Sequence, residues 1–150
     1  MTGTVLILGA SRGLGLGLAR EYHRRGWRVI ATERPQRPSQ GLRELADAAK
    51  GAVRVEPLDV TDWAALPELA KRLDGTALDL LFVNAGVADD PTRGIGEIAP
   101  EEFVRVMTTN ALAPLKAIEA LAPLVAPEGT VAAMSSALGS VELPPNGNFE

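Results

Sequence analysis

A regular alternation of short apolar segments with amphipathic segments is the feature that most constrains how this chain folds. The apolar segments are residues 4–8, 27–32, 53–58, 78–83 and 129–134. Segments this short and this apolar are typical of strands in a parallel sheet that helices cover on both faces. Five such strands separated by helical patterns predict an α/β fold: a Rossmann-like doubly wound parallel sheet, truncated after the fifth strand.

The segments between the strands have the spacing of amphipathic helices. Leu14, Leu18 and Tyr22 recur every four residues, and similar patterns cover residues 42–49 and 62–73. Polar residues occupy the other side of each pattern, so each predicted helix has one face for the sheet and one for solvent.

The last helical pattern is the longest. Apolar residues from Phe103 to Val125 follow a single stripe, which predicts a helix with a buried face. Residues 34–40 and 140–150 are rich in proline and polar residues and are expected to be loops. A sheet that stops after its fifth strand leaves that strand, or a neighbour, as an apolar edge, so we expect more chain or a partner there.

Composition excludes several classes of protein. The chain has 150 residues, 46% of them hydrophobic and 23% charged, which suits one domain and excludes disorder. A net charge of −4 offers no broad surface for nucleic acid. There is no cysteine, and His23 is the single histidine, so no disulfide or zinc site is expected. No signal peptide or membrane-length apolar segment is visible, which predicts a cytoplasmic protein.

Three glycines lie in the turn between the first strand and the first helix, in the sequence Gly-Ala-Ser-Arg-Gly-Leu-Gly. Such a turn lets a pyrophosphate approach the N-terminus of the helix, where free N–H groups and the positive end of the dipole meet the anion. A tight turn alone could also require glycines, but a position directly after a buried strand favours a dinucleotide site. The residues predicted to hold it are Gly9, Ser11, Arg12, Gly13, Leu14 and Gly15.

Charged residues at the end of the second strand bear on which dinucleotide binds. Glu33 lies 18 residues after Gly15, where an acidic side chain accepts hydrogen bonds from an adenosine ribose. Arg34 and Arg12 could instead pair with a ribose 2′-phosphate. A third interpretation is that all three are solvated surface charges.

These motifs together resemble those of the short-chain dehydrogenase/reductase family. Residues 8–15 resemble its Thr-Gly-x3-Gly-x-Gly loop, with Leu8 in place of the threonine. Residues 58–60 resemble its Asp-Val element, and residues 83–86 its Asn-Asn-Ala-Gly, with Val83 in place of the first asparagine. The resemblance covers nearly the whole chain. The sequences of residues 26–32 and 134–140 are most similar to those of the C-factor-type branch of these oxidoreductases.

The resemblance also implies roles for single residues. Asp59 and Val60 would contact the adenine, and Asn84, Ala85 and Gly86 would lie on the nicotinamide side. Two residues would belong to the catalytic tetrad of the family: Ser136, at the end of the fifth strand, and Asn110, in the long helix.

Each of these motifs has a simpler interpretation. Asn84 to Gly86 could be an ordinary turn after a strand, although ligands in open α/β sheets bind at this edge. Asp59 could cap the following helix, although Thr61 and Asp62 are better placed to do so. Ser136 could be a small polar residue that closes a strand.

Asn110 and Pro114 also support an inference from backbone chemistry. Residue 114 would normally donate its N–H to the carbonyl of residue 110, but proline has no N–H. The Asn110 carbonyl is therefore expected to be free at a kink midway along a buried face, where a water could bind it. In the family this carbonyl holds a water of the proton relay. The alternative is that Pro114 kinks the helix near its N-terminus and the carbonyl finds another donor.

The family's acid/base pair, Tyr-x3-Lys, is expected shortly after Ser136 but does not occur in the sequence. Tyr22 is the single tyrosine, and no lysine follows Lys116. A fragment of a longer protein, a naturally truncated pseudoenzyme and an error in the recorded chain are three explanations. Residues 1–150 would then be an NAD(P)-binding Rossmann domain that lacks its C-terminal part.

The sequence therefore predicts an NAD(P)-dependent oxidoreductase that moves a hydride between nicotinamide and a carbonyl or alcohol substrate, with NADP slightly favoured over NAD. The full-length protein is expected to be a homodimer or homotetramer, and this chain alone is expected to be inactive. A non-catalytic dinucleotide-binding module is the alternative. A methyltransferase-like Rossmann domain fits less well, because it gives Asn84 and Ser136 no role. No metal, nucleic-acid partner or membrane is expected.

Overall fold

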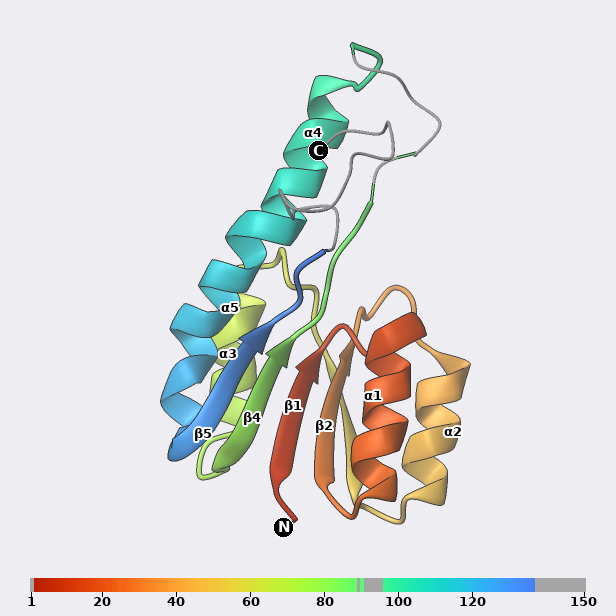
Figure 1. Cartoon of the computed structure of the whole chain (residues 1–150), viewed down its shortest axis with the longest axis vertical. Helices are drawn as coiled ribbons and strands as arrows, with labels where there is room; N and C mark the ends of the chain where they lie inside the picture. The colour runs from red at the N-terminus through yellow and green to blue at the C-terminus, as the bar shows by residue number, and fades with distance from the viewer. Residues whose placement is uncertain (1, 89, 91–95, 137–150) are drawn as a thin grey trace.

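The parallel sheet predicted from the apolar segments is present. In the computed structural model, which describes residues 2–88, 90 and 96–136, five parallel strands form one sheet. They are β1 (Thr4–Leu8), β2 (Arg28–Glu33), β3 (Val53–Pro57), β4 (Leu78–Val83) and β5 (Val125–Ala133). Their order is β3-β2-β1-β4-β5, so the winding reverses between β1 and β4 (Figure 1). This order is that of a Rossmann-like fold, which confirms the predicted fold class.

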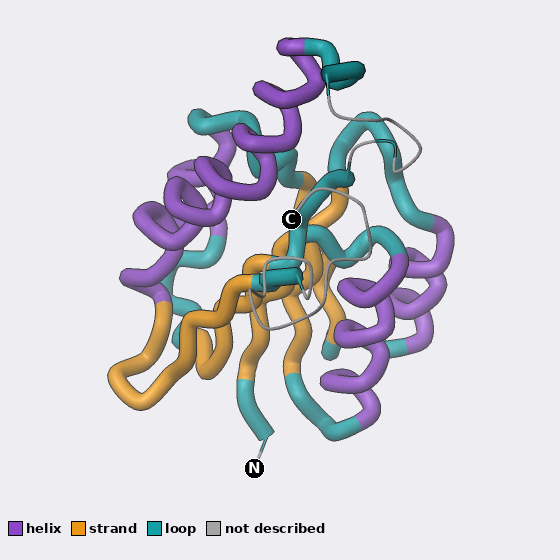
Figure 2. Tube along the Cα trace, turned by 45° about the horizontal axis from the view of Figure 1, so that its top comes forward, coloured by secondary structure: helices purple, strands orange, loops and turns teal. Residues whose placement is uncertain are grey.

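Helices cover both faces of the sheet, as Figure 2 shows. The first three are α1 (Gly13–Arg24), α2 (Gln40–Ala48) and α3 (Ala65–Arg72). Pro67 is the third residue of α3, where a missing N–H costs no intrahelical hydrogen bond.

Alternate side chains of β1 belong to two separate cores. Val5 and Ile7 pack with Ala19 of α1 and Leu42 of α2. Leu6 and Leu8 face the opposite way, in the core to which α3 contributes Leu66, Leu69 and Leu73. All five residues of β1 are buried, because a central strand has helices on both of its faces.

The predicted helix between β4 and β5 is present, but the prediction that its apolar stripe is buried is wrong for most of its length. It consists of α4 (Pro100–Met107), a π-helical turn (Thr108–Leu112), α5 (Ala113–Leu121) and a 3₁₀ turn (Ala122–Leu124). α4 has no buried residue, and in α5 only Ala113, Ala117 and Leu121 are buried. Phe103 and Leu115, which the stripe placed inside, are 58% and 66% exposed. In Figure 1 α4 extends past the ends of the strands, so no sheet lies beneath it.

β5 begins four residues earlier than the predicted segment 129–134. Its pairing with β4 shifts between Leu78–Val125 and Leu80–Thr130, which marks a β-bulge or irregularity. A Cβ on Gly129 would lie 2.8 Å from the Leu78 carbonyl oxygen, so the bulge requires glycine. Within the described residues β5 is an edge strand, as expected. The predicted loop 140–150 lies outside those residues.

Candidate cofactor and active site

The glycine-rich turn connects β1 to α1 at the carboxyl edge of the sheet. Gly9 and Gly13 have φ of +85° and +55°, in the left-handed region that favours glycine. A Cβ on Gly15 would lie 2.2 Å from the Gly9 carbonyl oxygen, whereas a Cβ on Gly13 would meet nothing within 4 Å. Packing therefore requires Gly15, and Gly13 leaves open space at the N-terminus of α1, where an anion could approach.

Hydrogen bonds from β2 and β4 hold this turn in place. The Gly9 N–H donates to Thr32 Oγ1 at 3.0 Å, and Asn84 Nδ2 donates to the Gly9 carbonyl at 2.8 Å. The Asn84 backbone N–H donates to the Leu8 carbonyl at 3.1 Å. Asn84 is therefore more than an ordinary turn residue, because its amide group connects the end of β4 to the glycine turn.

Glu33 does not behave as a solvated surface charge. It is only 9% exposed, and its Oε2 accepts a hydrogen bond from the Ser39 N–H at 2.5 Å. Its Oε1 lies 4.0 Å from Arg43 Nε. That interpretation is wrong for Glu33, whereas Arg12 and Arg34 are exposed.

Asp59 and Asp62 take separate roles after β3. Asp62 Oδ1 accepts hydrogen bonds from the N–H groups of Ala64 and Ala65, just before and at the first residue of α3. Asp59 Oδ1 accepts from the N–H and the hydroxyl of Thr61 at 3.0 and 2.7 Å. Within the described residues Asp59 Oδ2 has no hydrogen-bond partner.

Asn110 lies in the π-helical turn and contacts the segment that follows β4. Its Oδ1 accepts from the Val87 N–H at 2.9 Å, and its Nδ2 donates to the Val87 carbonyl at 2.7 Å. Arg105, about a turn and a half earlier, donates to the Ala88 carbonyl at 3.1 Å. Both side chains hold the segment after Gly86 against the helix.

The predicted disturbance of the helix around Pro114 takes the form of the π-helical turn, in which the Ala113 N–H reaches back to the Thr108 carbonyl. Because Pro114 cannot donate, a wider turn before it replaces the regular α-helical ladder. Asn110 itself is exposed, so the prediction that it lies midway along a buried face is wrong. That its carbonyl is free and binds a water stays a prediction.

A cleft of about 720 Å³ lies at this edge of the sheet. Every residue predicted to hold the cofactor lines it except Gly15, which is buried beneath the turn. Ser136 and Asn110 are not part of its lining, although a Cβ on Gly86 would lie 3.4 Å from Asn110 Oδ1.

The cleft is also lined by several residues that the sequence did not indicate as cofactor-binding. They are Thr32, Leu58, Thr61, Val87, Glu101, Val104, Arg105, Thr108 and Thr109. The first four adjoin predicted motifs and could have been found from them. The other five come from α4 and the π-helical turn, and nothing in the sequence indicates that these elements reach the cleft.

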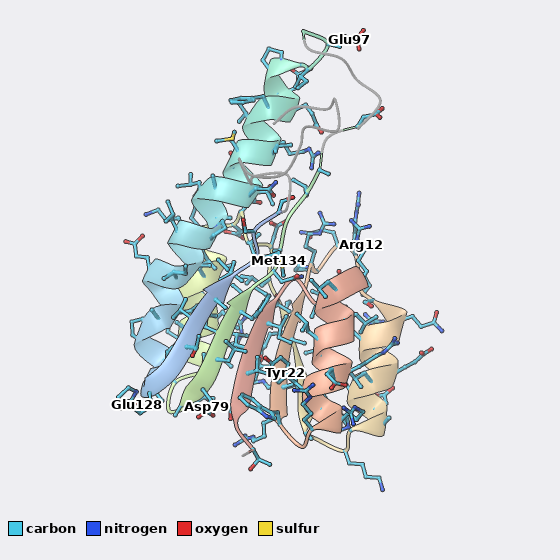
Figure 3. The ribbon with its side chains drawn as sticks, in the orientation of Figure 1. Arg12, Tyr22, Asp79, Glu97, Glu128 and Met134 are labelled. Atoms are coloured by element: carbon cyan, nitrogen blue, oxygen red, sulfur yellow. The ribbon has the colours of Figure 1, made fainter. Side chains whose placement is uncertain are left out.

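Figure 3 shows Arg12 and Met134 at the same edge of the sheet, the carboxyl edge, and Asp79 and Glu128 at the opposite edge. Tyr22 lies on α1 away from the cleft edge, and its ring packs against Trp27 with centroids 5.0 Å apart. Tyr22 is therefore not in a position to act as an acid or base in the cleft. Ser136 follows β5 and is exposed.

Glu21 and Glu68, two carboxyl groups with lowered pKa values, lie away from the cleft. Hydrogen bonds from Arg24 and then Arg25 lower the pKa of Glu21 to about 2, at the C-terminal end of α1. Lys71 lowers the pKa of Glu68 on α3 through a hydrogen bond in the same way. Among the described residues no cluster of three or more His, Cys, Asp or Glu is arranged for a metal ion, and none of the described helices has the length and apolarity to cross a bilayer.

The strand order and the glycine turn define a Rossmann-like α/β protein. The family model for short chain dehydrogenases matches residues 3–148, and the chain belongs to the short-chain dehydrogenase family. It is 34% identical over 146 residues to a short-chain dehydrogenase of Pyricularia oryzae, a match that covers 93% of this chain and 58% of that protein. The chain thus spans little more than half the length of this curated relative.

Two solved structures that are similar to the chain contain NADP. One is a short-chain dehydrogenase/reductase from Burkholderia multivorans with bound NADP, at 44% identity and a TM-score of 0.92, covering 97% of this chain and 64% of that one. The other is a carbonyl reductase from Pseudomonas aeruginosa PAO1 in complex with NADP, at 37% identity and a TM-score of 0.87, covering 93% of this chain and 63% of that one.

Proposed function

We propose that the whole protein is an NAD(P)-dependent oxidoreductase acting on a carbonyl or alcohol substrate, and that the described cleft holds the dinucleotide. The bound nicotinamide would supply the hydride chemistry. The observation that carries the proposal is Gly13: its left-handed φ of +55° and the open space beside it leave the N-terminus of α1 accessible to a pyrophosphate.

The residues around the cleft have complementary roles in this proposal. Gly9 to Gly15 hold the pyrophosphate, and Asp59 Oδ2, which has no hydrogen-bond partner in the described part of the chain, accepts from the adenine amino group. Ala85 and Gly86 border the nicotinamide side. Ser136 orients the substrate oxygen, and Asn110 positions the segment after β4 and takes part in proton transfer.

We further propose that NADP is the preferred dinucleotide. Arg12 and Arg34 line the cleft, and neither forms an ion pair with a described carboxylate. Glu33, the group that would repel a 2′-phosphate, has its charge directed to Ser39 and Arg43. The NADP bound to the two similar structures supports the same choice.

A titration of the 150-residue chain with NADPH and NADH tests the cofactor assignment. Gly13→Val should abolish binding of both, because a β-branched residue is strained at a φ of +55° and its side chain fills the approach to the helix. Gly17→Ala, also on α1 and with nothing within 4 Å of its added Cβ, is the matched control and should bind normally. Absence of binding to the unaltered chain, or unchanged binding by Gly13→Val, contradicts the proposal.

A non-catalytic dinucleotide-binding module is the second candidate. For residues 1–150 by themselves it is favoured by Tyr22, whose ring packs against Trp27 away from the cleft. We propose that the 150-residue chain binds NADPH but reduces no carbonyl substrate. Oxidation of NADPH by this chain in the presence of simple aldehydes and ketones would contradict that proposal.

A further inference from the structure

The carboxylate of Glu33 occupies an unusual position for an acid in the wall of a nucleotide cleft. The residue lines the cleft yet is 9% exposed, and both carboxylate oxygens are directed toward α2 and the loop before it. An acid that read an adenosine ribose would need an oxygen directed into the cleft. The contacts of Glu33 therefore point to another role.

Three hydrogen bonds fix the conformation of the segment between β2 and α2. The Glu33 carboxylate accepts from the Ser39 N–H at 2.5 Å, six residues along the chain. Inside this loop the Arg37 N–H donates to the Arg34 carbonyl at 3.0 Å, which makes a turn. Ser39 Oγ in turn accepts from the Leu42 N–H at 3.2 Å and caps α2. Glu33 thus connects the end of β2 to the start of α2 across the base of the loop.

Arg34 is the first residue of this loop and lines the cleft. Its backbone follows Glu33 directly, and its carbonyl closes the turn to Arg37. The direction of the Arg34 side chain is therefore set by the same loop that the Glu33 carboxylate closes. Because Arg43 Nε lies 4.0 Å from the carboxylate, the charge of Glu33 is partly compensated by Arg43.

We propose that Glu33 is a positioning residue that closes the loop of residues 34–39 and thereby holds Arg34 at a 2′-phosphate subsite. This inference rests on the proposed dinucleotide function and adds a specificity determinant to it. It reverses the role expected from the sequence, in which the acid opposes the 2′-phosphate by accepting hydrogen bonds from the ribose.

The two roles predict opposite effects of removing the carboxylate. If Glu33 repelled the 2′-phosphate, Glu33→Ala would improve binding of 2′-phosphorylated nucleotides. If Glu33 positions Arg34, Glu33→Ala weakens that binding, because the loop loses the hydrogen bond that closes it. Glu33→Gln keeps an oxygen that can accept from the Ser39 N–H and should restore most of the preference.

Adenosine 2′,5′-bisphosphate and adenosine 5′-monophosphate are suitable probes, because they differ only in the 2′-phosphate. Calorimetric titration of the full chain gives the ratio of their affinities. Glu33→Ala should lower this ratio by about tenfold, the effect of a lost hydrogen bond to a charged group, and Glu33→Gln should stay within about threefold of the unaltered chain. Glu44→Ala, which removes an exposed carboxylate from α2 outside the loop, is the matched control and should leave the ratio unchanged.

The variant Arg34→Ala separates action through Arg34 from a general effect on the loop. In the Arg34→Ala background, Glu33→Ala should change the ratio little, since the group that it positions is gone. Binding of adenosine 5′-monophosphate reports whether each variant is folded.

The inference is overturned if Glu33→Ala leaves the affinity ratio unchanged or raises it, or if Glu33→Gln lowers the ratio as much as Glu33→Ala does. It is also overturned if the control Glu44→Ala lowers the ratio equally, or if the effects of Glu33→Ala and Arg34→Ala on the ratio are additive. If the unaltered chain binds neither nucleotide, the proposed function itself fails, which is a distinguishable result.

Discussion

Glu33 and Arg34 are adjacent in the chain but differ in what their side chains contact. The carboxylate of Glu33 is buried against the Ser39 N–H, whereas the guanidinium of Arg34 is exposed at the cleft. From the sequence the two residues favoured different cofactors, and spacing alone could not rank them. Hydrogen-bond geometry separates them, because a carboxylate that already has a backbone donor and a nearby arginine is a weak competitor for a ribose.

The glycines of α1 allow a paired prediction at the same scale. Gly15→Ala should destabilise the chain by about 2 kcal/mol, because its Cβ would overlap the Gly9 carbonyl oxygen in a packed region. Gly17→Ala should stabilise it by about 0.5–1 kcal/mol, because the position is helical and open and alanine favours helix. Urea unfolding measures both, and equal effects of the two substitutions would contradict the packing argument.

Among the elements, those whose residues are buried on both sides are the ones that the sequence predicted best. β1 and β4 are almost wholly apolar, and the structure places both within the predicted limits. The α4–α5 helix was less predictable, because apolar spacing is the same whether a stripe faces a sheet or solvent. Phe103 and Leu115 fit the apolar spacing of core residues, yet both are exposed. For Phe103 the reason is that α4 extends past the ends of the strands.

Whether a site residue could be predicted also depends on whether local sequence or the tertiary arrangement places it in the cleft. Glycines are dictated by local backbone geometry, so Gly9 and Gly13 could be recognised from the motif alone. Arg105 and Thr109 reach the cleft only because α4 and the π-helical turn cross its rim, a tertiary arrangement that no local pattern encodes. The implied assignments of Ser136 and Asn110 as catalytic residues remain predictions.

The π-helical turn gives a prediction at the scale of an element. Asn110→Ala should accelerate amide hydrogen exchange at Val87 by about tenfold, because both hydrogen bonds between the Asn110 side chain and Val87 are lost. Asn110→Asp should have a smaller effect, since its carboxylate can still accept from the Val87 N–H. Lys116→Ala, an exposed substitution on α5, is the control, and unchanged exchange at Val87 in Asn110→Ala would contradict the assignment.

At the scale of the whole molecule, several large apolar side chains among the described residues are exposed on α4 and α5. Phe103, Val104, Met107 and Leu115 on α4 and α5 are each between 47% and 66% exposed. Exposed apolar patches of this kind mark association surfaces. We expect this surface to account for the dimer or tetramer predicted for the full-length protein.

Sedimentation velocity tests that expectation. The unaltered chain should associate as its concentration rises, and Leu115→Glu should shift it toward the monomer, because a charge would be desolvated in the interface. The neighbouring Lys116→Glu changes an exposed charge without removing apolar surface and should associate as before. A monomer at all concentrations for the unaltered chain, or equal effects of the two substitutions, would contradict it.

The described residues that line the cleft all lie between Gly9 and Thr109, in the turns after β1 to β4 and at the start of the long helix. Synthesis on the ribosome therefore delivers this entire wall before β5 emerges from the exit tunnel. If the cleft binds a dinucleotide as proposed, the nascent chain already carries these residues, and the binding free energy would favour the folded form of the nascent domain. Cofactor supply would then influence the yield of folded protein during translation as well as its later occupancy.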